Sequence, residues 1–179
     1  MRRTSGAVTV ECVRDDITTQ EDVDAVVNAA NARLGPGGGV ASAIHRAAGP
    51  GLAEEAMPLG PISPGDAVIT GAHGLPNWFV IHTLGPVYGQ DRPEAELLAR
   101  CYRNALALAE ENDASSVAFP AISTGIFGYP VEDAADVALQ TVREEAEGLR
   151  VVRLVRFVLF GQDDLETHER ALARLLPDS

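Results

Sequence analysis

The chain has 179 residues, 46% of them hydrophobic, which suits one domain with a substantial core and leaves little room for two. Its formal net charge of −12 argues against binding nucleic acid through a general basic surface, because phosphate neutralisation dominates that affinity. The sequence has no apolar run of about 18 residues, and its start lacks the apolar segment of a signal peptide. We therefore expect no membrane span, a cytoplasmic location and a monomer.

The two cysteines, Cys12 and Cys101, lie far apart in the sequence and form no paired motif. We therefore expect neither a disulfide framework nor a cysteine-rich metal site. No group of potential ligands has the spacing of a metal site, so we expect no metal and no cofactor. All basic residues are arginine, which excludes a lysine nucleophile.

Taken in chain order, segments typical of strands alternate with segments typical of helices. Apolar or alternating patterns predict strands over residues 8–13, 24–30, 67–70, 79–83, 116–121 and 154–160. Apolar faces at helical spacing predict helices over residues 40–48, 94–111, 131–145 and 164–176. A short helical turn is predicted over residues 18–22, with Thr18 and Glu21 as a weak capping box. This alternation predicts an α/β fold with a largely parallel sheet covered on both faces, and a ligand site beyond the carboxyl ends of its strands.

Two loops carry features of an anion site. In the first, Asn28 and Asn31 precede three glycines, residues 37–39, and then a predicted helix. Glycines let the backbone approach a ligand closely, and the helix N-terminus adds unpaired N–H groups, although a flexible turn would explain the glycines equally well. The second loop, residues 120–130, also joins a strand to a helix and adds hydroxyl groups. Together the two loops suit a diphosphate.

Two further residues have both a functional and a structural interpretation. Phe127 lies in the second loop between Gly125 and Gly128, where an aromatic ring lines a ligand face or simply packs. Asp16 follows the first predicted strand, where its carboxylate accepts a hydrogen bond from an exocyclic amine or caps the following turn.

These segments together resemble the macrodomain family over nearly the whole chain, so residues 1–179 are expected to form one macrodomain. The matching segments are residues 16–18, 23–31, 37–40 with 43–49, 80–86 and 117–130. The resemblance implies a three-layer α/β/α sandwich around a mixed, mostly parallel six-stranded sheet, with a cleft that binds ADP-ribose. It is closest to the branch that removes mono-ADP-ribose from proteins and deacetylates O-acetyl-ADP-ribose, so the implied partners are ADP-ribose and ADP-ribosylated proteins.

The resemblance also implies a role for each matching residue. Asp16 and the Ile17 backbone would bind the adenine, and Phe160 would pack on its face. Asn31 would bind the distal ribose beside its reacting carbon, and Phe127 would shape that pocket, so these two are the expected catalytic residues. The phosphates would be contacted by Gly38, Gly39, Val40, Ser123, Thr124, Gly125 and Ile126.

The chain departs from the family pattern at two positions. Some family hydrolases carry an aspartate where this chain has Ala41, which removes an obvious general base. Asp15 stands where glycine is usual. The loss at Ala41 leaves open a non-catalytic reader that only binds ADP-ribose, although the hydrolase remains our leading hypothesis.

For the histidines of the matching segments we favour a structural role over a catalytic one. His45 lies one helical turn after Ala41, which would suit catalysis, but a packed or capping histidine is the better interpretation. His82 lies in an apolar strand and is predicted to be a hydrogen-bonded core histidine. Asp66 is predicted to be a turn residue.

Overall fold

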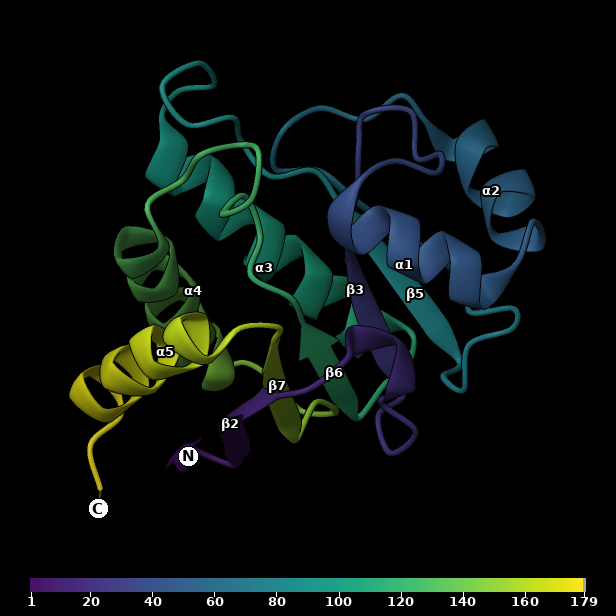
Figure 1. The fold of residues 1–179 in the computed structure, drawn as a ribbon. Coiled ribbons are helices and arrows are strands. Elements are labelled where there is room, and N and C mark those ends of the chain that lie inside the picture. The colour runs from purple at the N-terminus through teal and green to yellow at the C-terminus, as the bar shows by residue number, and fades with distance from the viewer. Residues whose placement is uncertain (179) are drawn as a thin grey trace.

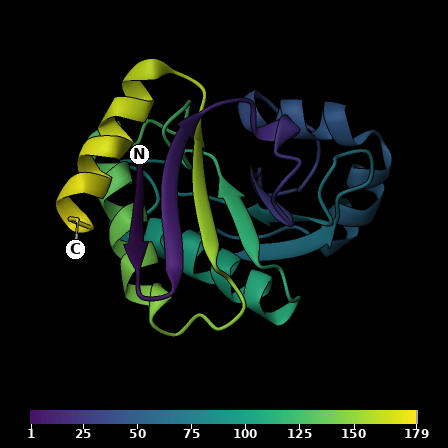
Figure 2. The same ribbon diagram turned by 90° about the horizontal axis from the view of Figure 1, so that it is seen from below.

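The computed structural model describes residues 1–178, which form a seven-stranded sheet with helices on both faces (Figures 1 and 2). The strands are β1 (Arg2–Ser5), β2 (Val8–Arg14), β3 (Ala25–Ala29), β4 (Ala67–Gly71), β5 (Phe79–Thr83), β6 (Ser116–Phe119) and β7 (Leu154–Leu159). Their order across the sheet is β1-β2-β7-β6-β3-β5-β4. The five inner strands run parallel, whereas β1 and β4 pair antiparallel with their neighbours at the two edges.

The sheet has one strand more than the six that we expected, and the extra strand is β1. It is short, it starts with two arginines, and it pairs only with β2. A short charged strand at a sheet edge carries little apolar pattern, because one of its sides meets water. The mixed, mostly parallel α/β architecture is otherwise confirmed.

Within residues 1–178, five helices cover the sheet. They are α1 (Gly39–Ala48), α2 (Gly51–Ala56), α3 (Glu94–Glu111), α4 (Val131–Ala146) and α5 (Gln162–Leu175). Two single 3-10 turns, η1 (Ile17–Thr19) and η2 (Met57–Leu59), lie in connections. One core cluster joins α3, α4 and α5 to the sheet, and a second joins α1 and α2 to the opposite face. The chain is therefore a sandwich of three layers (Figure 2).

The central strands are buried on both faces, which explains their nearly continuous apolar sequence. Neighbouring residues of one strand enter opposite clusters: Phe157 and Phe119 pack under α3 to α5, whereas Val158 and Ala118 pack under α1 and α2. Side chains of a strand alternate between the two faces, so a covered parallel strand needs apolar residues at every position.

The structure confirms most predicted elements to within a few residues and corrects one. The predicted capping box of Thr18 and Glu21 is wrong. The turn η1 begins at Ile17, and Asp16 is its N-cap, accepting a hydrogen bond from the Thr18 N–H. The short elements β1, α2 and η2 were not predicted. Within residues 1–178, no helix is both long enough and apolar enough to span a membrane.

Candidate functional site

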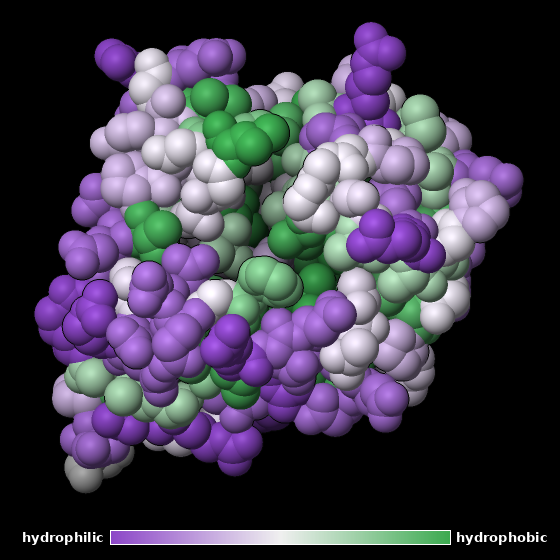
Figure 3. All heavy atoms as spheres, viewed as in Figure 1, coloured by the Kyte–Doolittle hydropathy of each residue, from purple (hydrophilic) through white to green (hydrophobic). Residues whose placement is uncertain are grey.

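A cavity of about 350 Å³ opens at the carboxyl ends of β3, β5 and β6. Its walls are formed by residues 29–31, 37–41, 85, 121–123 and 125–127. Figure 3 shows a hollow with hydrophobic residues at its base, between the parts of the molecule that contain α3 and α1, in a surface that is otherwise mostly hydrophilic. Both predicted loops therefore meet in one cavity, at the edge of the sheet where a ligand was expected.

The first loop brings the N-terminus of α1 to the cavity wall. Gly38 is the N-cap, and no side chain caps the helix, so the first N–H groups of α1 remain available at the cavity. Gly39 has a φ of 58°, in the left-handed region that favours glycine. Gly37 passes so close to Asn31 that an added Cβ would lie 2.9 Å from the Asn31 Nδ2 atom. Gly39 is therefore favoured by its backbone conformation and Gly37 by its close approach to Asn31, whereas Gly38 has neither constraint.

Asn31 is held in place by its own loop. Its Nδ2 atom donates to the Gly35 carbonyl at 2.8 Å, and its Oδ1 atom accepts from the Gly35 N–H at 3.3 Å. A carboxamide has a second N–H and a second lone pair, so these bonds leave one donor and one acceptor for a ligand. The side chain lines the cavity in a fixed orientation.

The second loop presents backbone N–H groups from the opposite wall. The N–H groups of residues 125–127 take part in none of the hydrogen bonds within residues 1–178. Ser123 has a φ of 67°, and its buried Oγ atom has no hydrogen-bond partner there. Phe127 lines the cavity, as predicted, and its carbonyl accepts from the Tyr88 N–H at 2.8 Å. Thr124 belongs to this loop but not to the cavity wall.

Gly85 is a wall residue to which we assigned no role from the sequence. A Cβ at this position would lie 2.1 Å from the Ser123 Oγ atom and 2.6 Å from the Ile122 Cγ2 atom. The segment after β5 therefore packs its backbone directly against the second loop. Its position in the sequence could have indicated a site role. Gly85 comes two residues after a buried parallel strand, at the same edge of the sheet as the other two loops.

Three predicted residues lie together outside the cavity wall. Asp16 and Ile17 follow β2, and Phe160 follows the neighbouring β7. The two strand ends are joined by a hydrogen bond from the Asp15 N–H to the Leu159 carbonyl at 3.1 Å. Phe160 is 90% exposed, so its ring makes little contact with the core.

Asp16 caps the turn with one carboxylate oxygen and leaves the other oxygen able to accept a hydrogen bond from a ligand. Its Oδ1 atom accepts from the Thr18 N–H at 2.8 Å and from the Thr18 hydroxyl at 2.7 Å. These hydrogen bonds lower the pKa of the Asp16 carboxyl, so it is ionised at neutral pH. Its Oδ2 atom accepts no hydrogen bond within residues 1–178, and the Ile17 N–H next to it is also unpaired there.

Of the other residues discussed from the sequence, Ala41 lies in the cavity wall, whereas His45, His82 and Asp66 lie outside it. Ala41 is buried against the cavity, where it contributes a methyl group and no base. His45 is buried behind the wall rather than in it. His82 is fully buried and hydrogen-bonded to Asn28 and Thr70, as predicted for a core histidine. Asp66 accepts from the Ser63 N–H at 2.9 Å, as predicted for a turn residue.

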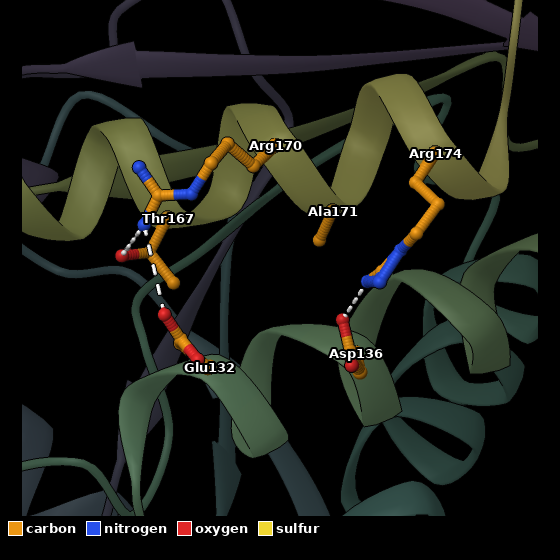
Figure 4. A pocket seen from close by; sticks show the side chains of 6 residues that line it. All are labelled: Glu132, Asp136, Thr167, Arg170, Ala171 and Arg174. Atoms are coloured by element: carbon orange, nitrogen blue, oxygen red, sulfur yellow. Dashed lines mark hydrogen bonds and ion pairs between the residues drawn. The ribbon is translucent and has the colours of Figure 1, made fainter.

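Within residues 1–178, no charged side chain lines the cavity, so backbone N–H groups and the N-terminus of α1 are the groups that would attract an anion there. A second cavity, of about 290 Å³, lies between α4 and α5 (Figure 4). It differs in kind, because its arginines, Arg170 and Arg174, pair with Glu132 and Asp136 across the groove. Each of these exposed arginines lies beside a carboxylate, which offsets its charge and weakens its attraction for an anion.

Residues 27–138 of the chain match the family described as Macro domain. The chain belongs to the macro domain family. This macro domain is 49% identical, over 93% of its length and 98% of the relative's, to an O-acetyl-ADP-ribose deacetylase of Klebsiella pneumoniae. It is 40% identical to a solved Oceanobacillus iheyensis macrodomain with ADP, with a TM-score of 0.93 and coverage of 98% and 95% of the two chains. A Trypanosoma brucei macrodomain in complex with ADP-ribose is 37% identical, with a TM-score of 0.82 and coverage of 91% of this chain and 68% of that one.

Proposed function

We propose that this macro domain binds ADP-ribose and hydrolyses it from mono-ADP-ribosylated proteins, and that it also deacetylates O-acetyl-ADP-ribose. The observation that carries the proposal is one cavity in which Asn31 and Phe127 meet two loops of unpaired N–H groups. The likeness to a named O-acetyl-ADP-ribose deacetylase supports the chemistry, and the likeness to macrodomains with ADP and ADP-ribose supports the ligand.

The proposed ligand follows the edge of the sheet. Its diphosphate lies between the N-terminus of α1 and residues 123–126, where N–H groups face it from both sides. Its adenine lies at the ends of β2 and β7, with the amine on Asp16 and the ring on Phe160. Its distal ribose reaches Asn31 and Phe127. This order uses the site residues that the resemblance implied, except that Thr124 belongs to the second loop but not to the cavity wall.

The proposed chemistry relies on orientation, because the part of the wall formed by residues 1–178 contains no ionisable side chain. Water attacks the ribose carbon that is bonded to the protein, which releases ADP-ribose and the free side chain, or it attacks the acetyl carbon of the small substrate, which releases acetate and ADP-ribose. In both cases the proton of the water passes to the leaving oxygen. The two loops fix the diphosphate, and Asn31 holds the ribose beside the reacting bond. Orientation alone is worth up to about 7–11 kcal/mol in favourable cases.

A second function is favoured by Ala41. With a methyl group where a base would stand, the same cavity could hold ADP-ribose without hydrolysis, as a reader of the modification. Fold does not decide between the two functions.

The first prediction separates hydrolase from reader. We expect Asn31→Ala to lower the rate of ADP-ribose release from an ester-linked, mono-ADP-ribosylated protein by a larger factor than it weakens binding of free ADP-ribose. The reason is that its contact lies beside the reacting carbon and strengthens in the transition state. Release is measured over time in the presence of EDTA, and binding is measured by calorimetry.

Ser42→Ala, one position beyond the cavity wall on α1, is the matched control for a change near the loop. Equal background release by the wild type and Asn31→Ala, together with tight ADP-ribose binding by the wild type, would establish the reader. No binding of ADP-ribose by the wild type at millimolar concentration would overturn both functions.

A further inference from the structure

The side chain of Gln20 is buried directly beneath the turn that carries Asp16. It is 2% exposed. Its Nε2 atom donates to the Asp16 carbonyl at 2.8 Å and to the Asp15 Oδ2 atom at 3.2 Å. Its Oε1 atom accepts from the Arg156 Nη1 atom at 3.0 Å. One amide therefore connects both acidic residues of the turn to a guanidinium on the sheet.

Arg156 fixes the other end of this connection. It lies on β7, four residues before Phe160, and its side chain is 12% exposed. Besides Gln20, it forms two hydrogen bonds with Asp22, at 2.7 and 2.8 Å, and one with Glu11 of β2, at 2.7 Å. A guanidinium held on three sides is a rigid anchor, because its planar donors cannot rotate independently.

The main chain of Gln20 is anchored as well. The Asn77 Nδ2 atom donates to the Gln20 carbonyl at 2.7 Å and to the Val23 carbonyl at 2.9 Å. Asn77 itself is buried. The Gln20 amide therefore has a fixed base from which to hold the turn above it.

The turn needs such support because it is short and its acidic side chains are exposed. The 3-10 element η1 contains three residues, and Asp15 and Asp16 place two carboxylates side by side. Asp15 is drawn back onto the protein, since its Oδ1 atom accepts from the Asp16 N–H at 2.8 Å and its Oδ2 atom accepts from Gln20. The Asp16 Oδ2 atom and the Ile17 N–H have no hydrogen-bond partner within residues 1–178, so they provide one acceptor and one donor at this end of the site.

We propose that Gln20, anchored by Arg156, is a positioning residue that sets the selectivity of the site for adenine over other purines. This inference rests on the adenine placement in the proposed function. Adenine offers an amine donor and a ring-nitrogen acceptor, which match the Asp16 carboxylate and the Ile17 N–H. Hypoxanthine offers a carbonyl and a ring N–H at the same two positions, so a rigid acceptor and donor pair rejects it.

Gln20→Met tests the inference, because methionine keeps the length of the side chain and removes its donor and acceptor. Calorimetry gives the Kd of ADP-ribose and of inosine diphosphate ribose for each variant. We define the selectivity ratio as the Kd of inosine diphosphate ribose divided by the Kd of ADP-ribose. We expect this ratio to fall about three- to tenfold in Gln20→Met, the size of effect associated with one buried hydrogen-bonding group. Arg156→Lys, which keeps the charge and loses the fork of donors, is expected to lower the ratio in the same direction.

Thr141→Val is the matched control for stability. The Thr141 side chain is buried on α4 and donates one hydrogen bond, to the Val137 carbonyl, away from the nucleotide end. We expect it to lower the melting temperature and leave the ratio unchanged. A Gln20→Met protein that loses stability but keeps the wild-type ratio would overturn the inference and make Gln20 a purely structural residue.

Asp16→Ala, measured in parallel, separates this failure from failure of the adenine placement. If Asp16→Ala collapses the ratio while Gln20→Met leaves it intact, the placement holds and the positioning role is wrong. If Asp16→Ala leaves the ratio unchanged, the adenine lies elsewhere and both the placement and the inference are overturned.

Discussion

His82 is a single buried residue that makes the stability of the fold depend on pH. It lies on β5 next to β3, and its two ring nitrogens contact Asn28 and Thr70 at 3.1 and 3.0 Å. Burial, with a smaller contribution from the neighbouring His45, lowers the pKa of His82 from 6.5 to about 4. The folded state therefore holds the neutral imidazole at pH values where the unfolded chain takes up a proton.

The second prediction follows from that difference. The contribution of His82 to the free energy of unfolding is fully present above the unfolded pKa of about 6.5 and is lost as the pH drops towards 4. The reason is that only the unfolded state binds the proton in this pH window. At pH 5 the loss from His82 amounts to up to about 2 kcal/mol, at 1.36 kcal/mol per pKa unit. Burial also lowers the pKa values of His45 and His168, so they act in the same direction.

Urea unfolding of the wild type and of His82→Gln at pH 7 and pH 5 measures this effect. We expect the free energy of unfolding of His82→Gln to depend less on pH than that of the wild type. Thr141→Val, which removes a buried hydrogen bond but no titratable group, is the matched control and should keep the wild-type pH dependence. Parallel pH profiles for the wild type and His82→Gln would contradict the prediction.

Among single residues, the sequence allowed those carried by a local pattern to be predicted, but not those defined by a distant partner. Gly38, Gly39 and Phe127 stand out because glycine runs and a glycine-flanked aromatic ring are visible along the chain. Gln20 has no such signal, because its meaning depends on Arg156, which lies 136 positions away in the sequence. From the sequence alone, a glutamine in a polar segment that is buried and hydrogen-bonded looks the same as one that is exposed to solvent. Only the fold shows that Arg156 lies beside Gln20.

At the scale of elements, the second loop keeps its shape because another connection is pressed against it. The backbone at Gly85, after β5, leaves no space for a side chain beside Ser123 and Ile122. The Tyr88 N–H bonds to the Phe127 carbonyl a few residues later, and the rings of Tyr88 and Tyr129 lie 4.9 Å apart. The loop after β5 is therefore a support for the phosphate loop.

The third prediction concerns this support. We expect Gly85→Ala to weaken ADP-ribose binding at least about tenfold and to destabilise the fold by about 1–3 kcal/mol, because the new methyl group must displace Ser123 and Ile122. Gly148→Ala is the control, since a Cβ there meets only the Glu145 carbonyl, at 3.7 Å. Unchanged affinity in Gly85→Ala would show that the second loop keeps its position without this contact.

The elements that could be predicted are those with a long, regular apolar pattern. The helix α3 agrees with its predicted bounds because it repeats an apolar face over several turns. The helix α2 escaped prediction because it has six residues, begins at a glycine and is too short to show a period. The strand β1 escaped because its pairing with β2 at the sheet edge leaves no apolar signal.

At the scale of the whole molecule, an acidic protein is proposed to bind an acidic ligand. The chain carries a net charge of −12, and among the residues that the structure describes, 1–178, no charged side chain lies in the cavity wall. Attraction between ADP-ribose and the site therefore comes from short-range N–H contacts, whereas the long-range field of the protein repels the diphosphate. A site built from lysine or arginine would show the opposite balance.

The fourth prediction uses salt to distinguish the two kinds of site. Raising the ionic strength from about 0.02 M to about 0.3 M shortens the Debye length to well under the size of the protein, which screens the repulsion and leaves the N–H contacts nearly unchanged. We expect the Kd of ADP-ribose to stay constant or to fall about two- to threefold over this range. Adenosine, which has no charge, is the matched control and should show no trend. A Kd that rises tenfold with salt would mean that arginines outside the wall, such as Arg14 or Arg46, bind the diphosphate, and the backbone cradle would have to be abandoned.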